Sequence, residues 1–125
     1  MLQTALKVTG IDHVVLYVRD LERARAFYEG FLGMELEHEG PGQAFLRCGT
    51  QQVALFTQRE GMELRPGSEM NHMALRLAAG ERAEVKAALE AAGCEVHGRP
   101  RDPDCLYFTD PDGHRLQVLT PAEQH

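Results

Sequence analysis

The chain has 125 residues, of which 43% are hydrophobic and 26% are charged, and its formal net charge is −6. This length and composition are those of one globular domain with a substantial core. An acidic chain without a basic cluster argues against a nucleic-acid or membrane partner, because both partners need a basic face.

The sequence favours a cytoplasmic protein. The first ten residues lack a charged segment followed by an apolar run, and no stretch approaches membrane-spanning length. The three cysteines, Cys48, Cys94 and Cys105, are odd in number and contain no CxxC pair. This usage is typical of a reducing compartment and not of a secreted disulfide framework.

An internal repeat organises the chain. Residues 11–18 (IDHVVLYV) recur 59 residues later as residues 70–77 (MNHMALRL). A repeat of this length indicates two copies of one supersecondary unit, which bury their apolar faces together. His13 and His72 occupy the same place in the two copies, so we expect a pseudo-twofold axis to relate them, and the pair suggests a shared metal site.

The periodicity of apolar residues predicts the same order of elements in both copies. In the first copy, we expect a strand at 13–18, a helix at 21–32 and strands at 34–38, 44–48 and 53–57. In the second copy, we expect a strand at 71–77, a helix at 81–92 and strands at 94–98, 106–109 and 115–119. Asp110-Pro111-Asp112-Gly113 is typical of a type I turn between the last two strands.

These elements predict an α+β fold with two tandem βαβββ modules. The repeats cover about residues 10–58 and 69–121, and the polar segment 59–68 joins them within one domain, residues 1–125. Alternation along the strands places Leu16 and Leu75 toward the helices, and His13 and His72 on the opposite face.

The same parity argument, applied to the last strand of each copy, turns Ala54 and Phe56 toward the helix. It pairs Leu55 with Gln117, and it places both on the histidine side. Four positions therefore surround one centre: His13, Leu55, His72 and Gln117. Leu55 cannot bind metal. The alternative for each histidine is a hydrogen-bonded or surface side chain, and a strand glutamine is most often a hydrogen-bonding group. His38 and His97 have no symmetric partner in this interpretation.

The pattern resembles the vicinal oxygen chelate superfamily, which includes glyoxalase I, fosfomycin-resistance thiol transferases, bleomycin-resistance proteins and extradiol dioxygenases. The resemblance rests on residues 11–13 (IDH), 27–28 (FY), 32–34 (LGM) and 71–72 (NH), and above all on residues 107–117 (YFTDPDGHRLQ). Family members typically carry Glu where this chain has Gln117.

The resemblance implies a U-shaped, partly closed mixed sheet around a central cleft, with the helices outside. It implies a divalent metal ion held by His13, His72 and Gln117, with Fe²⁺ or Mn²⁺ favoured and Zn²⁺ or Ni²⁺ as alternatives. The neutral amide of Gln117 compensates less of the cation's charge than a carboxylate does. By resemblance, the catalytic residues are Tyr107, whose phenol binds an oxygen near the metal, and His97.

We expect a metal-dependent enzyme that acts on a small molecule, with a dioxygenase-like oxidoreductase reaction favoured, and we expect a homodimer. Leu55 at the fourth-ligand position argues against glyoxalase I chemistry. His125 follows Gln117 too soon to supply the later oxyanion-binding arginine of the fosfomycin-type transferases. Those two enzyme types remain alternatives, as does a metal-free, bleomycin-sequestering type of binding protein. An acidic chain suits this last class because such drugs are cationic.

Overall fold

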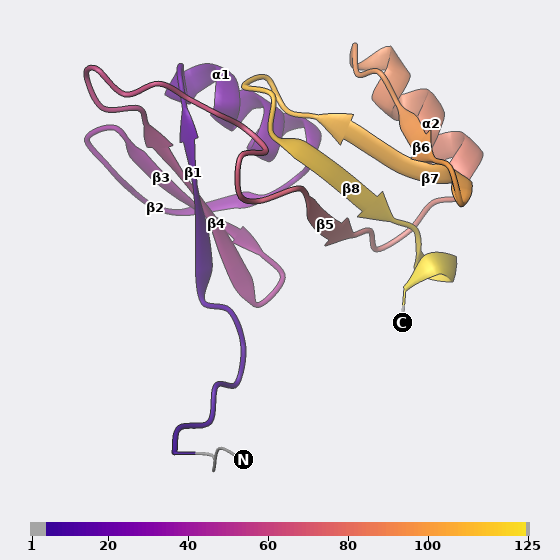
Figure 1. Cartoon of the computed structure of the whole chain (residues 1–125), viewed down its shortest axis with the longest axis horizontal. Helices are drawn as coiled ribbons and strands as arrows, with labels where there is room; N and C mark the ends of the chain where they lie inside the picture. The colour runs from indigo at the N-terminus through magenta and orange to yellow at the C-terminus, as the bar shows by residue number, and fades with distance from the viewer. Residues whose placement is uncertain (1–4, 125) are drawn as a thin grey trace. The chain divides into compact units, whose positions relative to one another are not determined.

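The computed structural model describes residues 5–124, and the chain divides into two compact units between Thr57 and Gln58. Each unit is one βαβββ module, which confirms the predicted α+β fold and the repeat (Figure 1). The polar segment predicted as a linker, residues 59–68, groups with the second unit. None of the helices found in residues 5–124 combines the length and apolar content of a membrane-spanning segment.

The two modules contain the following elements. The first has β1 (His13–Val18), α1 (Leu21–Arg25), the π-helix η1 (Ala26–Phe31), β2 (Glu35–Gly40), β3 (Gln43–Cys48) and β4 (Gln51–Thr57). The second has β5 (Met73–Arg76), α2 (Arg82–Ala91), β6 (His97–Arg99), β7 (Asp102–Thr109), β8 (Arg115–Leu119) and the 3-10 helix η2 (Pro121–Glu123).

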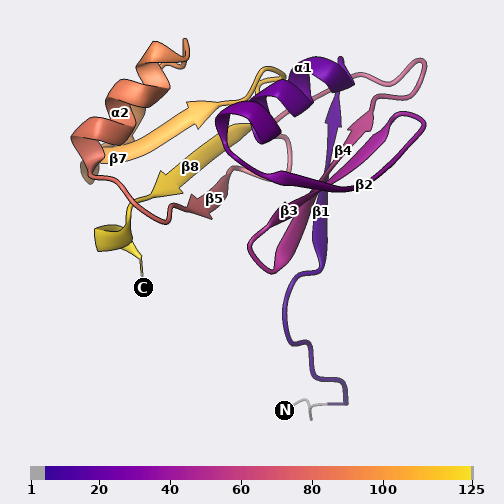
Figure 2. The ribbon, with the colours of Figure 1, turned by 180° about the vertical axis from the view of Figure 1, so that it is seen from behind.

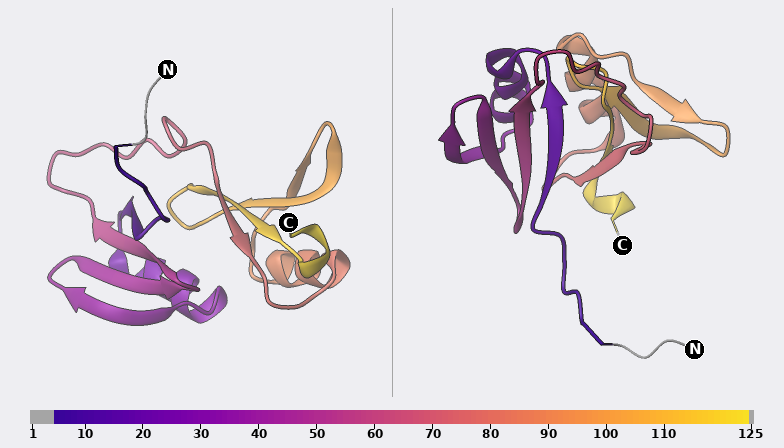
Figure 3. Two further views of the ribbon diagram at one scale, coloured as in Figure 1. Left: turned by 90° about the horizontal axis from the view of Figure 1, so that it is seen from below. Right: turned by 60° about the vertical axis from the view of Figure 1, so that its left-hand side comes forward.

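Each module contains a four-stranded sheet with the same topology. The strand order is β1-β4-β3-β2 in the first module and β5-β8-β7-β6 in the second. The first and last strands of a module run parallel, and the other neighbours are antiparallel. Within each module the helix lies along one side of its own sheet (Figures 2 and 3). The opposite face, which we call the open face, carries no helix of that module.

The core of each module lies between its helix and its sheet. In the first module the buried side chains include Leu16, Val18, Ala24, Tyr28, Leu46 and Leu55. In the second they include Leu75, Leu89, Leu106, Phe108, Leu116 and Val118. Burying apolar area of this kind is the main favourable contribution to folding.

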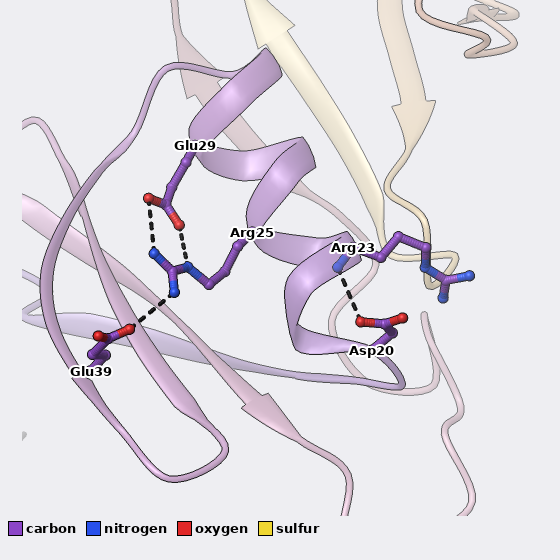
Figure 4. A network of polar contacts seen from close by, with 5 residues as sticks. All are labelled: Asp20, Arg23, Arg25, Glu29 and Glu39. Carbon is purple, nitrogen blue, oxygen red and sulfur yellow. Dashed lines mark hydrogen bonds and ion pairs between the residues drawn. The ribbon is translucent and has the colours of Figure 1, made fainter.

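The first helix begins as predicted but continues in a different form. The Asp20 carboxylate accepts a hydrogen bond from the Arg23 backbone N–H at 3.1 Å, which caps α1 (Figure 4). From Ala26 the chain forms a π-helix and not the predicted α-helix; for example, the Leu32 N–H donates to the Phe27 carbonyl at 2.9 Å. An apolar spacing over only six residues cannot distinguish the two helical forms.

Arg25 ties this helical segment to the sheet. Its guanidinium donates to the carboxylates of Glu29, one helical turn on, and Glu39 in β2 (Figure 4). The hydrogen bond to Glu29 is the main cause that raises the pKa of Arg25. Because the three side chains are partly exposed, this network orients the helix more than it stabilises the fold.

Three strands of the second module differ in length from their predicted spans. β5 and β6 are shorter, whereas β7 starts at Asp102, four residues before the predicted start at Leu106. The early part of β7 contains Asp102, Pro103 and Asp104, which are residues that disfavour strands. It forms a strand because it pairs with β6 in a hairpin, with Arg99 opposite Asp102.

The predicted turn at residues 110–113 is present and is held by Asp110. The Gly113 N–H donates to the Asp110 carbonyl at 3.1 Å. Asp110 Oδ1 accepts from the backbone N–H groups of Asp112 at 2.9 Å and His114 at 2.8 Å, and Oδ2 lies 2.8 Å from His114 Nδ1. The Asp110 side chain is fully buried, so its carboxylate depends on these partners.

We predict that Asp110→Ala lowers the free energy of unfolding by about 2–4 kcal/mol, because buried donors that served a carboxylate lose their acceptor. Urea unfolding measures the change. Asp104→Ala is the matched control, since the Asp104 side chain is 75% exposed, and it should shift stability by less than about 0.5 kcal/mol. Equal effects of the two substitutions would contradict the role assigned to Asp110.

Candidate functional site

The predicted site residues of the second module lie together on its open face. Strand pairing aligns His97 with Tyr107, Tyr107 with Gln117, and Gln117 with Ala74. Residues in register share a face of the sheet, so these four side chains form one row across it. His72 precedes β5 and contacts the row, because its ring lies 5.1 Å from the Tyr107 ring in an edge-to-face arrangement.

The first module repeats this row with different residues. Pairing aligns His38 with Phe45, Phe45 with Ala54, and Ala54 with Val15. His38 therefore occupies the register position of His97, and the prediction that these histidines have no symmetric partner is wrong. Each shares its row with an aromatic residue in the next strand, Phe45 in the first module and Tyr107 in the second.

The register also corrects the predicted face of β4. Ala54 pairs with Val15 and lies on the open face with His13, whereas Leu55 pairs with Leu16 and is buried in the core. Ala54, and not Leu55, is therefore the counterpart of Gln117. The parity argument failed because Val53, Ala54 and Leu55 are all buried, so this strand shows no alternation from which a face could be inferred.

Each of the two equivalent histidines is held by the residue that precedes it. His13 Nδ1 lies 2.7 Å from Asp12 Oδ2, and His72 Nδ1 lies 2.8 Å from Asn71 Oδ1. An oxygen acceptor at Nδ1 favours the tautomer that carries its proton there, which leaves the lone pair of Nε2 for a ligand. Metal-binding histidines are typically oriented in this way by a second hydrogen bond.

The sequence interpretation named Asp12 and Asn71 only as parts of a motif. The signal that could have identified their role is the oxygen-bearing side chain directly before the histidine in both copies of the repeat.

Tyr107 is the centre of a cluster of polar groups in the second module. It is 3% exposed, and its hydroxyl accepts a hydrogen bond from Arg99 Nη1 at 3.4 Å. The guanidinium carbon of Arg115 lies 4.2 Å from the centre of its ring, which is a cation–π contact. The Tyr107 side chain therefore contacts two cations, Arg99 and Arg115, and the nearly perpendicular ring of His72. The sequence interpretation did not name Arg99.

A hollow of about 430 Å³ lies beside this phenol within the second module. Its lining includes His97, Tyr107 and Arg115, together with Asn71 and Pro66. The His97 side chain is 67% exposed, and its Nε2 lies 3.6 Å from Glu95 Oε2. The structure thus brings both residues that were predicted to be catalytic, Tyr107 and His97, to the same cavity.

Three guanidinium groups near this row lack a carboxylate partner among the residues that the structure describes. We call Arg76, Arg99 and Arg115 the arginine group. Arg76 pairs with Leu119 in register, two residues along from the Gln117–Ala74 pair, and so lies on the open face. None of the three forms an ion pair with any residue between 5 and 124. Unpaired cations beside a hollow are suited to bind an anion.

The side chains available as metal ligands are few in this structure. Among the described residues there is no group of three or more His, Cys, Asp or Glu side chains that could hold a metal. The predicted set contains two histidines, His13 and His72, and its third donor is the amide of Gln117, a type of ligand outside those four. The cysteines are free; burial raises the pKa of Cys48 and Cys94, and Cys105 is buried with its thiol donating to the Asp102 carbonyl.

Comparison with known proteins gives the family. The family model described as "Glyoxalase/Bleomycin resistance protein/Dioxygenase superfamily" matches residues 10–118. The chain belongs to this superfamily. The resemblance that the sequence indicated is thereby confirmed over nearly the whole chain.

Relatives within the family narrow the class of protein. The glutathione transferase FosA of Serratia marcescens is 29% identical over 111 residues, which cover 87% of this chain and 79% of FosA. The metallothiol transferase FosB of Staphylococcus epidermidis is 28% identical over 123 residues, which cover 92% of this chain and 84% of FosB. These relatives support the transferase alternative and give no support to a dioxygenase-like reaction.

A solved structure shares the fold. The fosfomycin resistance protein FosX of Listeria monocytogenes, determined with Mn(II) and sulfate, superposes with a TM-score of 0.73 at 22% identity, covering 91% of each chain. The two chains therefore share the same fold.

We predict that Gly98→Ala disturbs the β6–β7 hairpin that carries His97. A Cβ atom on Gly98 would lie 2.1 Å from the Pro103 carbonyl oxygen, so the backbone must shift. We expect a loss of about 1–3 kcal/mol in urea unfolding. Gly30→Ala is the control, because no atom lies within 4 Å of its added Cβ. A Gly98→Ala protein as stable as the native chain would contradict the close approach.

Proposed function

We propose that this chain is a divalent-metal-dependent enzyme that adds a thiol to an electrophilic carbon of a small anionic molecule. A carbon–sulfur bond forms as a carbon–oxygen bond of the substrate breaks, and the released oxygen takes up the proton that the thiol loses. The ligands that we propose from the sequence are His13, His72 and Gln117, which would hold the ion through Nε2 of each histidine and the amide oxygen of the glutamine. The observation that carries the proposal is the matched pair of hydrogen bonds at Nδ1, 2.7 Å to Asp12 and 2.8 Å to Asn71, in equivalent places of the two modules.

The donor set fits a divalent cation of intermediate softness. Imidazole nitrogens with an amide oxygen suit Mn²⁺, Fe²⁺ or Zn²⁺ and select weakly among them. When bound, such an ion supplies Lewis acidity toward an oxygen of the substrate. FosB is a metallothiol transferase and the FosX structure contains Mn(II), and both relatives support a metal of this kind here.

The geometry of the second module supports the roles that we propose for its other residues at the site. Arg115 and Arg99 neutralise the substrate's anionic group beside the Tyr107 hydroxyl. The phenol donates its proton as a hydrogen bond to a substrate oxygen, since Arg99 already donates to the phenol. His97 lines the same hollow, and its imidazole would accept the proton of the incoming thiol.

The thiol is a second substrate in this proposal. Burial raises the pKa of Cys48 and Cys94, which disfavours their thiolates, and Cys105 is only 2% exposed. The arginine group also argues against a metal-free protein that sequesters a cationic drug, because three unpaired guanidinium groups would repel such a ligand.

We predict that His72→Ala or His13→Ala abolishes stoichiometric Mn(II) binding, as measured by electron paramagnetic resonance of free Mn(II) during titration. Asn71→Ala removes only the group that orients His72 and should weaken binding by about 10- to 100-fold. His38→Ala is the control and should leave the stoichiometry unchanged. Full Mn(II) binding by His72→Ala would reject the proposed ligand set.

A second prediction tests the amide ligand. Gln117→Glu places a carboxylate on a stem of the same length, and it should tighten Mn(II) binding by about 1–3 kcal/mol if Gln117 is a ligand. If Gln117 only bonds its neighbours, the new charge at this buried position lowers the melting temperature and leaves affinity unchanged. The two outcomes differ in sign, and the second would exclude Gln117 from the ligand set.

A further inference from the structure

The centre of the second module's open face carries guanidinium groups and no acidic strand residue. β5, β8 and the end of β7, all described by the structure, place the following side chains on it: Ala74, Arg76, Tyr107, Thr109, Arg115, Gln117 and Leu119. Two carboxylates lie toward the edge strand β6. Glu95 is 3.6 Å from His97. Asp102 pairs with Arg99 in register but forms no ion pair with it. In a chain whose formal net charge is −6, this face is therefore cationic.

The fold itself does not require these cations. The offset of 59 residues between the repeats places Tyr17 of the first module at the position of Arg76, and strand register places Gln52 at that of Arg115. Both counterparts are neutral, and the first module forms the same sheet topology with them. Like charges on one face repel each other, and an anionic ligand removes that repulsion. The arginines therefore point to a ligand and not to the packing of the module.

Arg99 and Arg115 meet at Tyr107, and we call these two arginines the first pole. Arg99 Nη1 lies 3.4 Å from the phenol oxygen, and the guanidinium carbon of Arg115 lies 4.2 Å from the centre of the ring. A cation–π contact orients a guanidinium but leaves its charge uncompensated. Arg115 also lines the hollow of about 430 Å³ beside Tyr107, so an anionic group that enters the hollow can reach the first pole.

Arg76 is a second pole on the other side of Gln117. Arg115 precedes Gln117 by two residues in β8, and Arg76 is in register with the residue two places after it. Four residue steps of about 3.3 Å separate Arg115 from Arg76 along the parallel strands, which is a span of about 13 Å. At this spacing a single carboxylate serves one pole, whereas a molecule with two anionic groups can bind both.

We propose that the small anionic substrate carries two anionic groups, of which one binds the first pole and the other binds Arg76. That the ligand is a substrate rests on the proposed function, whereas the two poles rest on the second module alone. Each guanidinium offers N–H groups in a planar fork that matches a carboxylate or a phosphate. Neither Arg76 nor Arg115 spends this fork on an ion pair with any residue between 5 and 124.

Paired probes isolate the contribution of the second anionic group. Succinate, adipate and suberate are each compared with the monocarboxylate of the same chain length, namely butyrate, hexanoate and octanoate. Isothermal titration calorimetry of the full chain at neutral pH and low ionic strength gives the ratio of the two affinities at each length. We expect a ratio of about three- to tenfold at the length that spans the poles, as one further exposed ion pair would provide. The protein is freed of metal by dialysis against a chelator, which is then removed.

Three variants assign the second group to its pole. Arg76→Gln should reduce the ratio toward one and leave the affinity for the monocarboxylate nearly unchanged. Arg115→Gln should weaken both members of a pair, because both use the first pole. Lys86→Gln is the matched control, since it removes the same charge from an exposed position of α2 and should preserve the ratio. Melting curves establish that each variant is folded.

Ratios near one at all three lengths in the native chain would overturn this inference. Ratios that survive Arg76→Gln would also overturn it, as would ratios that fall equally in Lys86→Gln, because net charge alone would then explain them. None of these outcomes bears on the metal site, since the protein is titrated without metal. The proposed function fails separately, if Mn(II) does not bind or if its binding survives His72→Ala.

Discussion

Parallel pairing of the first and last strands fixes which side chains can act together in each module. β1 aligns Val15 with Ala54, and β5 aligns Ala74 with Gln117, so the same register occurs twice. Residues in register share a face, and the helix packs on the other face, so the side chains of the open face point away from the helix of their own module. A slip of one residue in either pair would bury Gln117 or Ala54 beneath a helix and expose a core leucine or valine.

This constraint explains how the two modules could keep one backbone and diverge in chemistry. The helix-covered positions are apolar in both, for example Leu16 with Leu55 and Leu75 with Val118. On the open face, the two modules share histidine at two equivalent positions. One position holds His13 and His72, and the other holds His38 and His97 in the edge strands. Between them, Tyr17, Phe45 and Gln52 of the first module occupy the positions of Arg76, Tyr107 and Arg115 in the second, and Ala54 occupies that of Gln117. These positions lie away from the helix, so the two modules keep one fold while their chemistry differs.

The sequence predicted those parts of the fold in which its local signals were strong. The strands around His13 and His72 alternate clearly, so their faces were correct, and Asp110 to Gly113 has the residues that a type I turn prefers. The face of β4 could not be predicted because Val53 to Leu55 are uniformly apolar. β7 extends back through Asp102 because of its pairing with β6, a non-local contact that outweighs propensity. The hydrogen bond from Arg99 to Tyr107 depends on the same hairpin. It could not be predicted from the sequence, because local signals do not reveal this pairing.

The neutral amide of Gln117 has a consequence for the charge of the proposed site. Two neutral imidazoles and one amide leave the full charge of a divalent ion uncompensated, and Arg99 and Arg115 beside Tyr107 add to it. A carboxylate ligand would offset part of this charge within the protein. With an amide, the compensating negative charge must come from the substrate, so the oxyanion and the metal each improve the site for the other. In the proposed site the metal ion would bind modestly alone and more firmly with an anionic substrate, so that occupancy by the one would favour occupancy by the other.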